Sequence, residues 1–295
     1  MLPLKKSDSP FPRPDWEAVY ESQVGVKMSD AELTVFWTDL GRDWMQLLRP
    51  ALGSAYKIYE SANFWLVSDQ PEKTCRHLVQ WAEATHAKVL KLVDVDATKH
   101  LFGKCPILIV PDLETYDAYC ALYIPEEHLG PSGGVFLNHG YGHFIFPFYN
   151  LNQAEPVLVH ELAHSLVSHL PLPAWVNEGV AQLCENIISG ADSIDYEKIK
   201  EFSGTFWTSE TIQDFWSGKG FSRFDEGQIL SYHLAREVTR ELAADRMRFL
   251  PFLRDAEWSD SGAAALSAHF GLTLSELIAD YLGAGDWAPQ GAMQK

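Results

Sequence analysis

The sequence predicts an α+β fold, with a mixed N-terminal half that contains a small sheet and a mainly helical C-terminal half. Three observations lead to this expectation. Short apolar or alternating runs bounded by turn residues, which are typical of strands, occur before residue 150. From residue 153 onward, apolar residues recur at helical spacing almost to the end of the chain. A polar residue followed three positions later by glutamate, which is a helix-start signal, precedes a helical run in each half.

The N-terminal half begins with residues 1–15, whose proline and polar content is typical of a mobile arm. Ser29 and Glu32 then form a capping box, and the apolar residues after them keep helical spacing. The expected elements of this half are a helix after Ser29, one or two strands within 56–69, a helix from 69 to about 92, a strand at 105–112, a helix at 113–123, and paired strands at 132–138 and 142–148.

In the C-terminal half, Asn152 and Glu155 form a second pair of the capping-box type, with Pro156 in the first turn of the helix that follows. The helices expected in this half cover residues 153–169, 174–188, 194–203, 208–217, 225–242, 244–254, 259–269 and 273–283. The sequence shows no internal repeat that would indicate a solenoid.

The composition of the chain indicates which kinds of partner and which cellular compartment to expect. The 295 residues carry a net charge of −17, and both nucleic acids and anionic membranes select basic patches, so the sequence favours neither partner. The four cysteines show no CxxC spacing and are expected to be small buried hydrophobic residues in a reducing compartment. No signal-peptide core precedes the chain's first helix, and no run reaches the roughly 18 apolar residues of a membrane span, so we expect a cytoplasmic protein.

The segment HELAHSL holds the polar side chains that stand out in an otherwise apolar helix. A spacing of four places His160 and His164 one turn apart on one face of that helix. Glu161 lies about 100° further round the helix, beside the two imidazoles. This HExxH arrangement supplies two imidazole ligands for zinc and a neighbouring carboxylate that can act as a base. Leucine, valine and alanine fill the other faces, so the histidine edge is left to face a cleft.

A catalytic zinc site has a third protein ligand besides the two histidines. Glu178 follows His164 after an interval of 13 residues that contains two prolines, and it lies on a second expected helix. The packed face of that helix is expected to hold Val176, Val180, Leu183, Cys184 and Ile187, and the opposite side is expected to hold Glu178, Ala181, Gln182 and Glu185. His169 is the rival ligand, but a spacing of five places it about 140° from His164. We therefore favour Glu178.

The segments HELAHSL and PAWVNEGVAQLCE resemble the gluzincin clan of zinc metallopeptidases, and more narrowly the bacterial peptidase MA-like domains, which carry HExxH followed by W-x-x-E-G-x-A. The two motifs cover about thirty residues, and the similarity over the rest of the chain is one of pattern. The resemblance implies a zincin-like, thermolysin-type catalytic domain over residues 55–290, preceded by an N-terminal arm and helix at 1–54. Within that domain, an α+β lobe would span 55–150, and a helical lobe at 151–290 would carry the zinc site.

By this resemblance the chain is a zinc-dependent metallopeptidase with one zinc ion, held by His160, His164 and Glu178. Glu161 would activate a zinc-bound water for attack on a peptide or protein substrate. The alternative is a catalytically inactive, peptidase-like zinc module that binds a peptide or protein partner. The presence of Glu161 argues against this alternative, because a structural zinc site needs no base.

Other residues are weaker candidates. An oxyanion on the zinc needs a second donor, and Tyr232 and His233 on a downstream helix are the candidates, although a core tyrosine and a surface histidine explain them as well. The segment SGGVFLN resembles the clan's edge strand beneath the substrate, but a plain hairpin strand is an equal interpretation. Its candidate substrate-binding residues are Gly133, Gly134, Val135 and Phe136.

Three further hypotheses concern polar side chains near these motifs. Gln182 is a candidate to orient a zinc ligand, with an ordinary surface glutamine as the alternative. His139 and His143 flank a turn and are a remote candidate for a second metal site. An aminopeptidase would need carboxylates to hold the substrate amine, and the available ones are Glu126, Glu127 and Glu155.

Overall fold

A computed structural model of the chain describes all residues except 1, 7–8, 96–101, 125–132, 191–194 and 291–295. The α+β class predicted from the sequence is confirmed, since helices dominate and a five-stranded mixed sheet lies in the N-terminal half. The chain divides into two compact units, which are unit 1 (residues 1–91 and 95–166) and unit 2 (residues 92–94 and 167–295).

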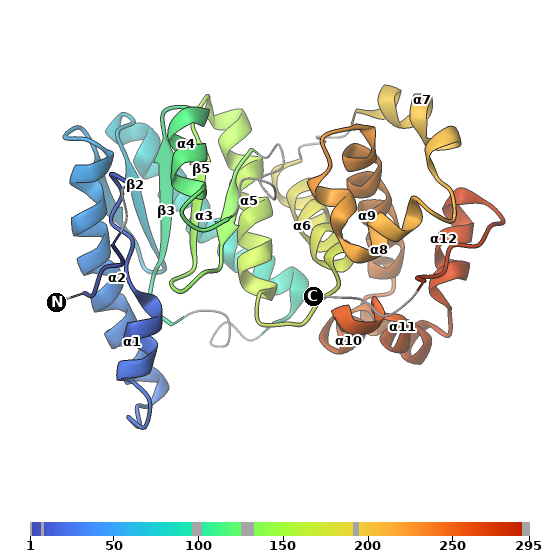
Figure 1. The fold of residues 1–295 in the computed structure, drawn as a ribbon, viewed down its shortest axis with the longest axis horizontal. Coiled ribbons are helices and arrows are strands. Elements are labelled where there is room, and N and C mark those ends of the chain that lie inside the picture. The colour runs from blue at the N-terminus through green and yellow to red at the C-terminus, as the bar shows by residue number, and fades with distance from the viewer. Residues whose placement is uncertain (1, 7–8, 96–101, 125–132, 191–194, 291–295) are drawn as a thin grey trace. The chain divides into compact units, whose positions relative to one another are not determined.

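Unit 1 contains the sheet and the helices that cover it (Figure 1). Its elements are α1 (Trp16–Ser22), α2 (Asp30–Leu52), β1 (Lys57–Glu60), β2 (Phe64–Ser68), α3 (Glu72–Val93), β3 (Cys105–Val110), α4 (Leu113–Cys120), β4 (Val135–Leu137), β5 (His143–Pro147) and α5 (Leu151–Val167). The expected elements from residue 29 onward are all present, and the capping box at Ser29 and Glu32 starts α2 as predicted. Helix α1 was not expected.

The five strands form one sheet in the order β1-β2-β3-β5-β4. The three central strands β2, β3 and β5 pair in parallel, whereas the edge strands β1 and β4 are antiparallel to their neighbours. Every residue of the three central strands is buried, which is expected for parallel strands that are covered on both faces. Among the described residues, strand β4 pairs with β5 alone and is an edge of the sheet.

Alternate side chains of the central strands contact two different layers of helices. One face, which includes Trp65 and Leu108, forms a continuous core with residues of α2 and α4, and Figure 1 shows both helices beside the sheet. On the other face, the ring of Phe64 lies 5.8 Å from the ring of His86 in α3. Helix α3 is the crossover that parallel pairing of β2 with β3 requires.

The described part of the N-terminal arm is packed, so the expectation of a mobile arm is wrong for it. Leu2 and Phe11 are only 5% and 7% exposed. Leu4 and Pro14 form an isolated β-bridge, and the ring of Phe11 lies 5.5 Å from that of Tyr119. These apolar residues are spread among prolines and follow no period, so the sequence pattern could not reveal that they bind a surface of the sheet unit.

The start of helix α5 also differs from the prediction. The side-chain Oδ1 of Asn150 accepts the backbone N–H of Gln153 at 3.1 Å, so Asn150 caps the helix. The predicted capping pair of Asn152 and Glu155 is therefore wrong, and Pro156 lies in the second turn of α5 rather than in the first. Asn150 and Asn152 offer the same cap chemistry, and the glutamate three positions after Asn152 favoured the wrong asparagine.

Unit 2 is built from the helices that follow α5. Its elements are α6 (Ala174–Ser189), α7 (Tyr196–Phe206), α8 (Ile212–Ser217), the 3₁₀ helix η2 (Lys219–Ser222), α9 (Glu226–Ala244), α10 (Arg246–Asp255), the 3₁₀ helix η3 (Trp258–Asp260), α11 (Ala263–Phe270) and α12 (Leu274–Leu282). These α-helices match the expected ones, with shifts of a few residues at their ends. Among the described residues, no helix combines the length and apolarity needed to cross a membrane.

Helices α6 and α9 approach each other closely within unit 2. A Cβ atom added at Gly179 of α6 would lie 2.0 Å from Oγ1 of Thr239 and 2.6 Å from the carbonyl oxygen of Ala235, both in α9. Only glycine fits at this contact, because the carbonyl group belongs to the backbone and cannot move aside. Gly179 follows Glu178 directly, so the contact fixes the part of α6 that carries Glu178.

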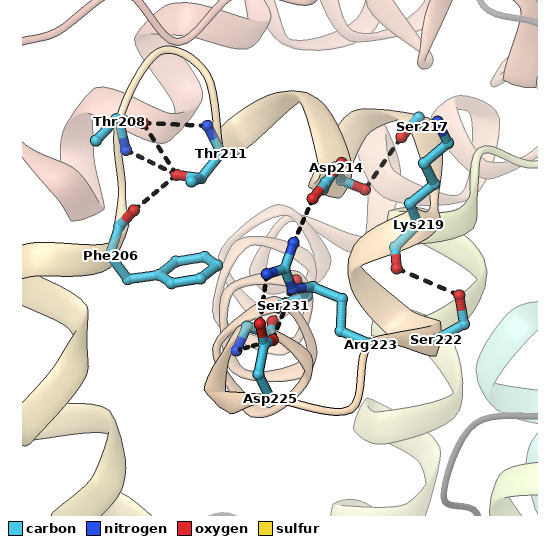
Figure 2. A network of polar contacts seen from close by, with 11 residues as sticks. Phe206, Thr208, Thr211, Asp214, Ser217, Lys219, Ser222, Arg223, Asp225 and Ser231 are labelled. Atoms are coloured by element: carbon cyan, nitrogen blue, oxygen red, sulfur yellow. Dashed lines mark hydrogen bonds and ion pairs between the residues drawn. The ribbon is translucent and has the colours of Figure 1, made fainter.

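The start of α9 is held by the polar network of Figure 2. Nη1 of Arg223 donates to Oδ2 of Asp214 in α8 at 2.5 Å, and Nε donates to Oδ1 of Asp225 at 2.6 Å. Asp225 also caps α9 by accepting the N–H of Gly227 at 3.0 Å. The hydrogen bond from Arg223 lowers the pKa of the Asp225 carboxyl, which keeps this cap charged. The network anchors the helix that bears Tyr232 and His233.

Candidate metal centre

Helix α5 brings the two histidines of the HExxH motif together. The Nε2 atoms of His160 and His164 lie 3.0 Å apart, and the ring planes are inclined at 77°. Both side chains are half-buried. The predicted apolar residues of α5 are buried, and they are Leu158, Val159, Leu162, Ala163, Leu166 and Val167. The histidine edge is therefore the polar edge of this stretch, as the sequence predicted.

Glu178 lies in the second turn of α6, but this helix is more enclosed than expected. Ala181, Gln182 and Glu185, which were expected on the side opposite the packed face, are only 0%, 9% and 7% exposed. Ile187, which was expected to be packed, is 54% exposed. The prediction of one apolar face was wrong here because neighbouring helices of unit 2 cover α6 on more than one side. Glu178 itself is half-buried.

The side chains of His160, His164 and Glu178 form a group that could hold a metal ion, because one ligand atom from each lies within 4.8 Å of the others. Two nitrogen ligands at about 2.0–2.1 Å from a tetrahedral ion are about 3.3 Å apart, and the observed Nε2–Nε2 distance of 3.0 Å is close to this value. In the part of the chain that the structure describes, this is the one such group of three, and His169 is not a member.

Glu161, the expected base, is directed to the edge of the sheet. It is only 6% exposed, and its Oε2 accepts the backbone N–H of Phe136 in β4 at 2.6 Å. A buried carboxylate needs such a donor, because burial of an unpartnered charge is costly. Phe136 was expected to bind substrate, and its contact with Glu161 was not predicted. No sequence signal indicates it, since it depends on how β4 lies against α5.

The glycines of the expected substrate strand lie against α5. A Cβ atom added at Gly133 would be 3.1 Å from Cγ2 of Val157, and one added at Gly134 would be 2.6 Å from Cγ1 of the same residue. Val135 pairs with Ile145 of β5. Val135 and Phe136 therefore lie in β4, within the strand predicted at 132–138, and the two glycines directly precede β4.

The second pair of histidines does not form a metal site. Both ring nitrogens of His143 have protein partners, because Nε2 lies 2.9 Å from the hydroxyl of Tyr119 and Nδ1 lies 2.8 Å from the carbonyl oxygen of Tyr141. Burial lowers the pKa of His143 to about 4, so the ring is neutral at pH 7. The structure gives no group of metal-binding side chains that includes His139 or His143 among its described residues.

The remaining candidates have contacts of other kinds. The ring of Tyr232 lies 5.2 Å from that of Phe221, and the ring of His233 lies 6.1 Å from that of Tyr196. These contacts are within unit 2, and both side chains are half-buried. Gln182 is buried rather than a surface residue.

The three carboxylates that were candidates for binding a substrate amine are Glu126, Glu127 and Glu155. Oε1 of Glu155 lies 2.5 Å from Nε2 of His77, so this carboxylate already has a partner on α3. Glu126 and Glu127 lie outside the described residues.

None of the four cysteines belongs to the metal-binding group found among the described residues. All four are buried and none forms a disulfide, as expected for small hydrophobic residues. Burial raises the pKa of Cys184 to about 12, so its thiol is protonated at neutral pH. Cys184 lies on α6 with Glu178, but it is not a member of the metal-binding group.

Comparison with known proteins returns no match, either to a protein-family model or to a curated protein. The candidate centre therefore rests on the residues themselves, namely two imidazoles, one carboxylate of a second helix, and an adjacent buried glutamate.

Proposed function

We propose that this chain is a zinc-dependent peptidase that hydrolyses peptide bonds at the group formed by His160, His164 and Glu178. The observation that carries the proposal is the combination of this group with a separate carboxylate, Glu161, on the same helix as the two histidines. A site that only binds metal for stability has no use for a glutamate in that place.

The donor set is the reason for choosing zinc. Two imidazole nitrogens and one carboxylate oxygen are ligands of catalytic zinc sites, which keep one further position open. Calcium and magnesium prefer sites built from oxygen alone, so the two histidines disfavour both ions. When bound, zinc polarises a carbonyl group and lowers the pKa of water to about 7.

Glu161 supplies the proton transfers of the proposed reaction. Its carboxylate takes a proton from the attacking water and delivers it to the leaving amine, as a general base and then a general acid. The hydrogen bond from Phe136 holds one carboxylate oxygen at a fixed place on the sheet edge. The base and the ligand histidines share α5, so their relative positions are set by one rigid helix.

A peptide substrate fits the surroundings of this site better than a nucleic acid. The chain has a net charge of −17, which repels polyanions. Glu161 contacts β4, which is an edge strand, and edge strands bind extended peptides through backbone hydrogen bonds. Together these two features favour a peptide or protein substrate.

The experiment that tests the proposal combines metal analysis with a peptide-library digest of the full chain. The wild type is expected to hold about one zinc ion per chain and to cleave peptides. Glu161→Gln is expected to keep zinc and to lower the cleavage rate by about 10²- to 10⁴-fold, because it removes the base. Glu155→Gln, a change on the same helix, serves as the matched control and should keep both properties.

Two results would contradict the proposal. A wild-type chain that neither contains zinc nor takes it up would remove the basis for catalysis. A Glu161→Gln variant that cleaves peptides at the wild-type rate would assign the reaction to other residues. A wild type that holds zinc but cleaves nothing in the library would instead support the inactive, partner-binding zinc module.

A further inference from the structure

We propose that β4 positions the catalytic base, with the backbone N–H of Phe136 holding the carboxylate of Glu161 and Gly134 allowing the strand to come close enough. This inference rests on the proposed function of Glu161, and it assigns the glycine and the peptide group a role in the reaction. Neither residue touches the reacting atoms in this account, so both are positioning residues.

The hydrogen bond itself is short and comes from a rigid donor. The backbone nitrogen of Phe136 lies 2.6 Å from Oε2 of Glu161, and hydrogen bonds to a charged acceptor are shorter and stronger than those between neutral groups. A backbone donor has no rotamers of its own, unlike a side-chain donor. Glu161 is 6% exposed, so water does not compete strongly for the carboxylate, and the bond restricts the rotamers of an otherwise flexible side chain.

The contacts between the β4 segment and α5 recur at matching intervals along the strand and along the helix. Gly134 lies against Val157, and Phe136 lies against Glu161. Two residues of a strand advance by about 6.7 Å, and four residues of a helix advance by about 6 Å, so the two contacts repeat at nearly the same interval. The contact at Gly134 therefore sets the distance at which Phe136 reaches Glu161.

The space at Gly134 admits no side chain. A Cβ atom there would lie 2.6 Å from Cγ1 of Val157 and 2.8 Å from Cβ of Phe146. Phe146 belongs to the central strand β5, and its Cβ is fixed by the backbone, so β4 itself would have to move away. Movement of β4 would lengthen the hydrogen bond to Glu161.

The N–H of Phe136 can be removed without loss of a sheet hydrogen bond. Phe136 is opposite Phe144 in the antiparallel pair, and its N–H is directed at Glu161 rather than at β5. Proline is tolerated in an edge strand at a residue whose N–H faces away from the neighbouring strand. Phe136→Pro therefore removes the donor, and Phe136→Leu is the matched reference that loses the ring but keeps the N–H.

The test compares these two variants in the zinc-loaded full chain. We expect the kcat of Phe136→Pro to be about 10- to 100-fold below that of Phe136→Leu. Displacement of a catalytic group by about 1 Å lowers the rate by amounts of this size. KM and zinc content are expected to be similar in the two variants. Equal kcat values would overturn the proposal, and so would a loss in Phe136→Pro that appears in zinc content rather than in kcat.

A second measurement needs neither catalysis nor a change in β4. Hydrogen exchange of the Phe136 amide, followed by NMR, is expected to be at least about tenfold faster in Glu161→Ala than in the wild type, because a hydrogen bond protects the amide from solvent. The amide of Leu137, whose residue is 1% exposed, is the internal control and should not change. Unchanged exchange at Phe136 would overturn the proposal even if Phe136→Pro failed to fold.

Gly134→Ala tests the second half of the inference. It should lower kcat in the same way as Phe136→Pro and should also speed exchange of the Phe136 amide, since β4 must shift. Wild-type kcat and exchange in Gly134→Ala would limit the positioning role to Phe136. If the wild type cleaves no peptide at all, the proposed function fails, whereas the exchange measurements still decide whether β4 holds Glu161.

Discussion

Two sets of histidines in unit 1 differ in what satisfies their ring nitrogens. His143 is fully buried, and both of its nitrogens face fixed oxygen atoms of Tyr119 and Tyr141. His160 and His164 are half-buried and direct their Nε2 atoms at one another, 3.0 Å apart. One histidine is thus a completed part of the core, while the other two converge on a common point.

The difference separates a structural histidine from a candidate ligand better than burial alone. A buried ring with a hydroxyl and a carbonyl partner has no nitrogen left for a metal ion. Two rings one helical turn apart, with a carboxylate close by, present three donors that an ion can share. We therefore expect metal binding to depend on His160 and His164, and stability in acid to depend on His143.

The largest effect that this comparison predicts concerns zinc affinity. His164→Ala should weaken zinc binding by more than about 100-fold, because even the loss of residues that orient a ligand costs 10- to 100-fold. His143→Phe should leave the zinc affinity within about twofold, since His143 is not in the metal-binding group. Competition titration with a zinc-binding dye measures both values. An equal loss of zinc affinity in the two variants would contradict the proposed difference between His164 and His143.

The same comparison predicts an effect on stability in acid. The pKa of His143 is lowered from 6.5 to about 4 in the fold, mainly by burial. Between these values the unfolded chain binds a proton that the folded chain does not. The protonation of His143 in the unfolded chain should therefore lower the free energy of unfolding of the protein by about 3 kcal/mol as the pH drops from 6.5 to 4.

Denaturant unfolding of wild type and His143→Phe across this pH window checks the prediction. The variant should be less stable at pH 7, by about 1–3 kcal/mol, because Tyr119 and Tyr141 lose a buried partner. It should also lack the wild type's steeper decline in acid. Tyr119→Phe keeps the titrating ring and should retain most of that decline. Parallel pH profiles of wild type and His143→Phe would contradict the assignment of this effect to His143.

Local signals account for the features that the sequence predicted well. The capping box of Ser29 and Glu32 involves residues three positions apart, and its backbone and side-chain hydrogen bonds are present. The spacing of His160 and His164 is likewise local, because it follows from the pitch of one helix. Glu178 required a further step, the recognition of a second helix after two prolines, and the ligand atoms of all three residues are close together.

Features that depend on contacts distant in sequence were not predictable in this way. The strand order and the parallel pairs of β2, β3 and β5 depend on which strands become neighbours, and the apolar runs do not encode this. The burial of Phe11 depends on Tyr119, more than one hundred positions away. The bond from Phe136 to Glu161 depends on a close approach at Gly134, where the sequence shows only that a glycine is present.

The most direct test of the proposed zinc centre is zinc K-edge X-ray absorption spectroscopy of the full chain with one equivalent of zinc. We expect two imidazole nitrogens at about 2.0–2.1 Å from the zinc ion together with oxygen ligands, and one imidazole fewer in His160→Ala. A spectrum with sulfur at about 2.3 Å, or with oxygen ligands and no imidazole, would contradict it.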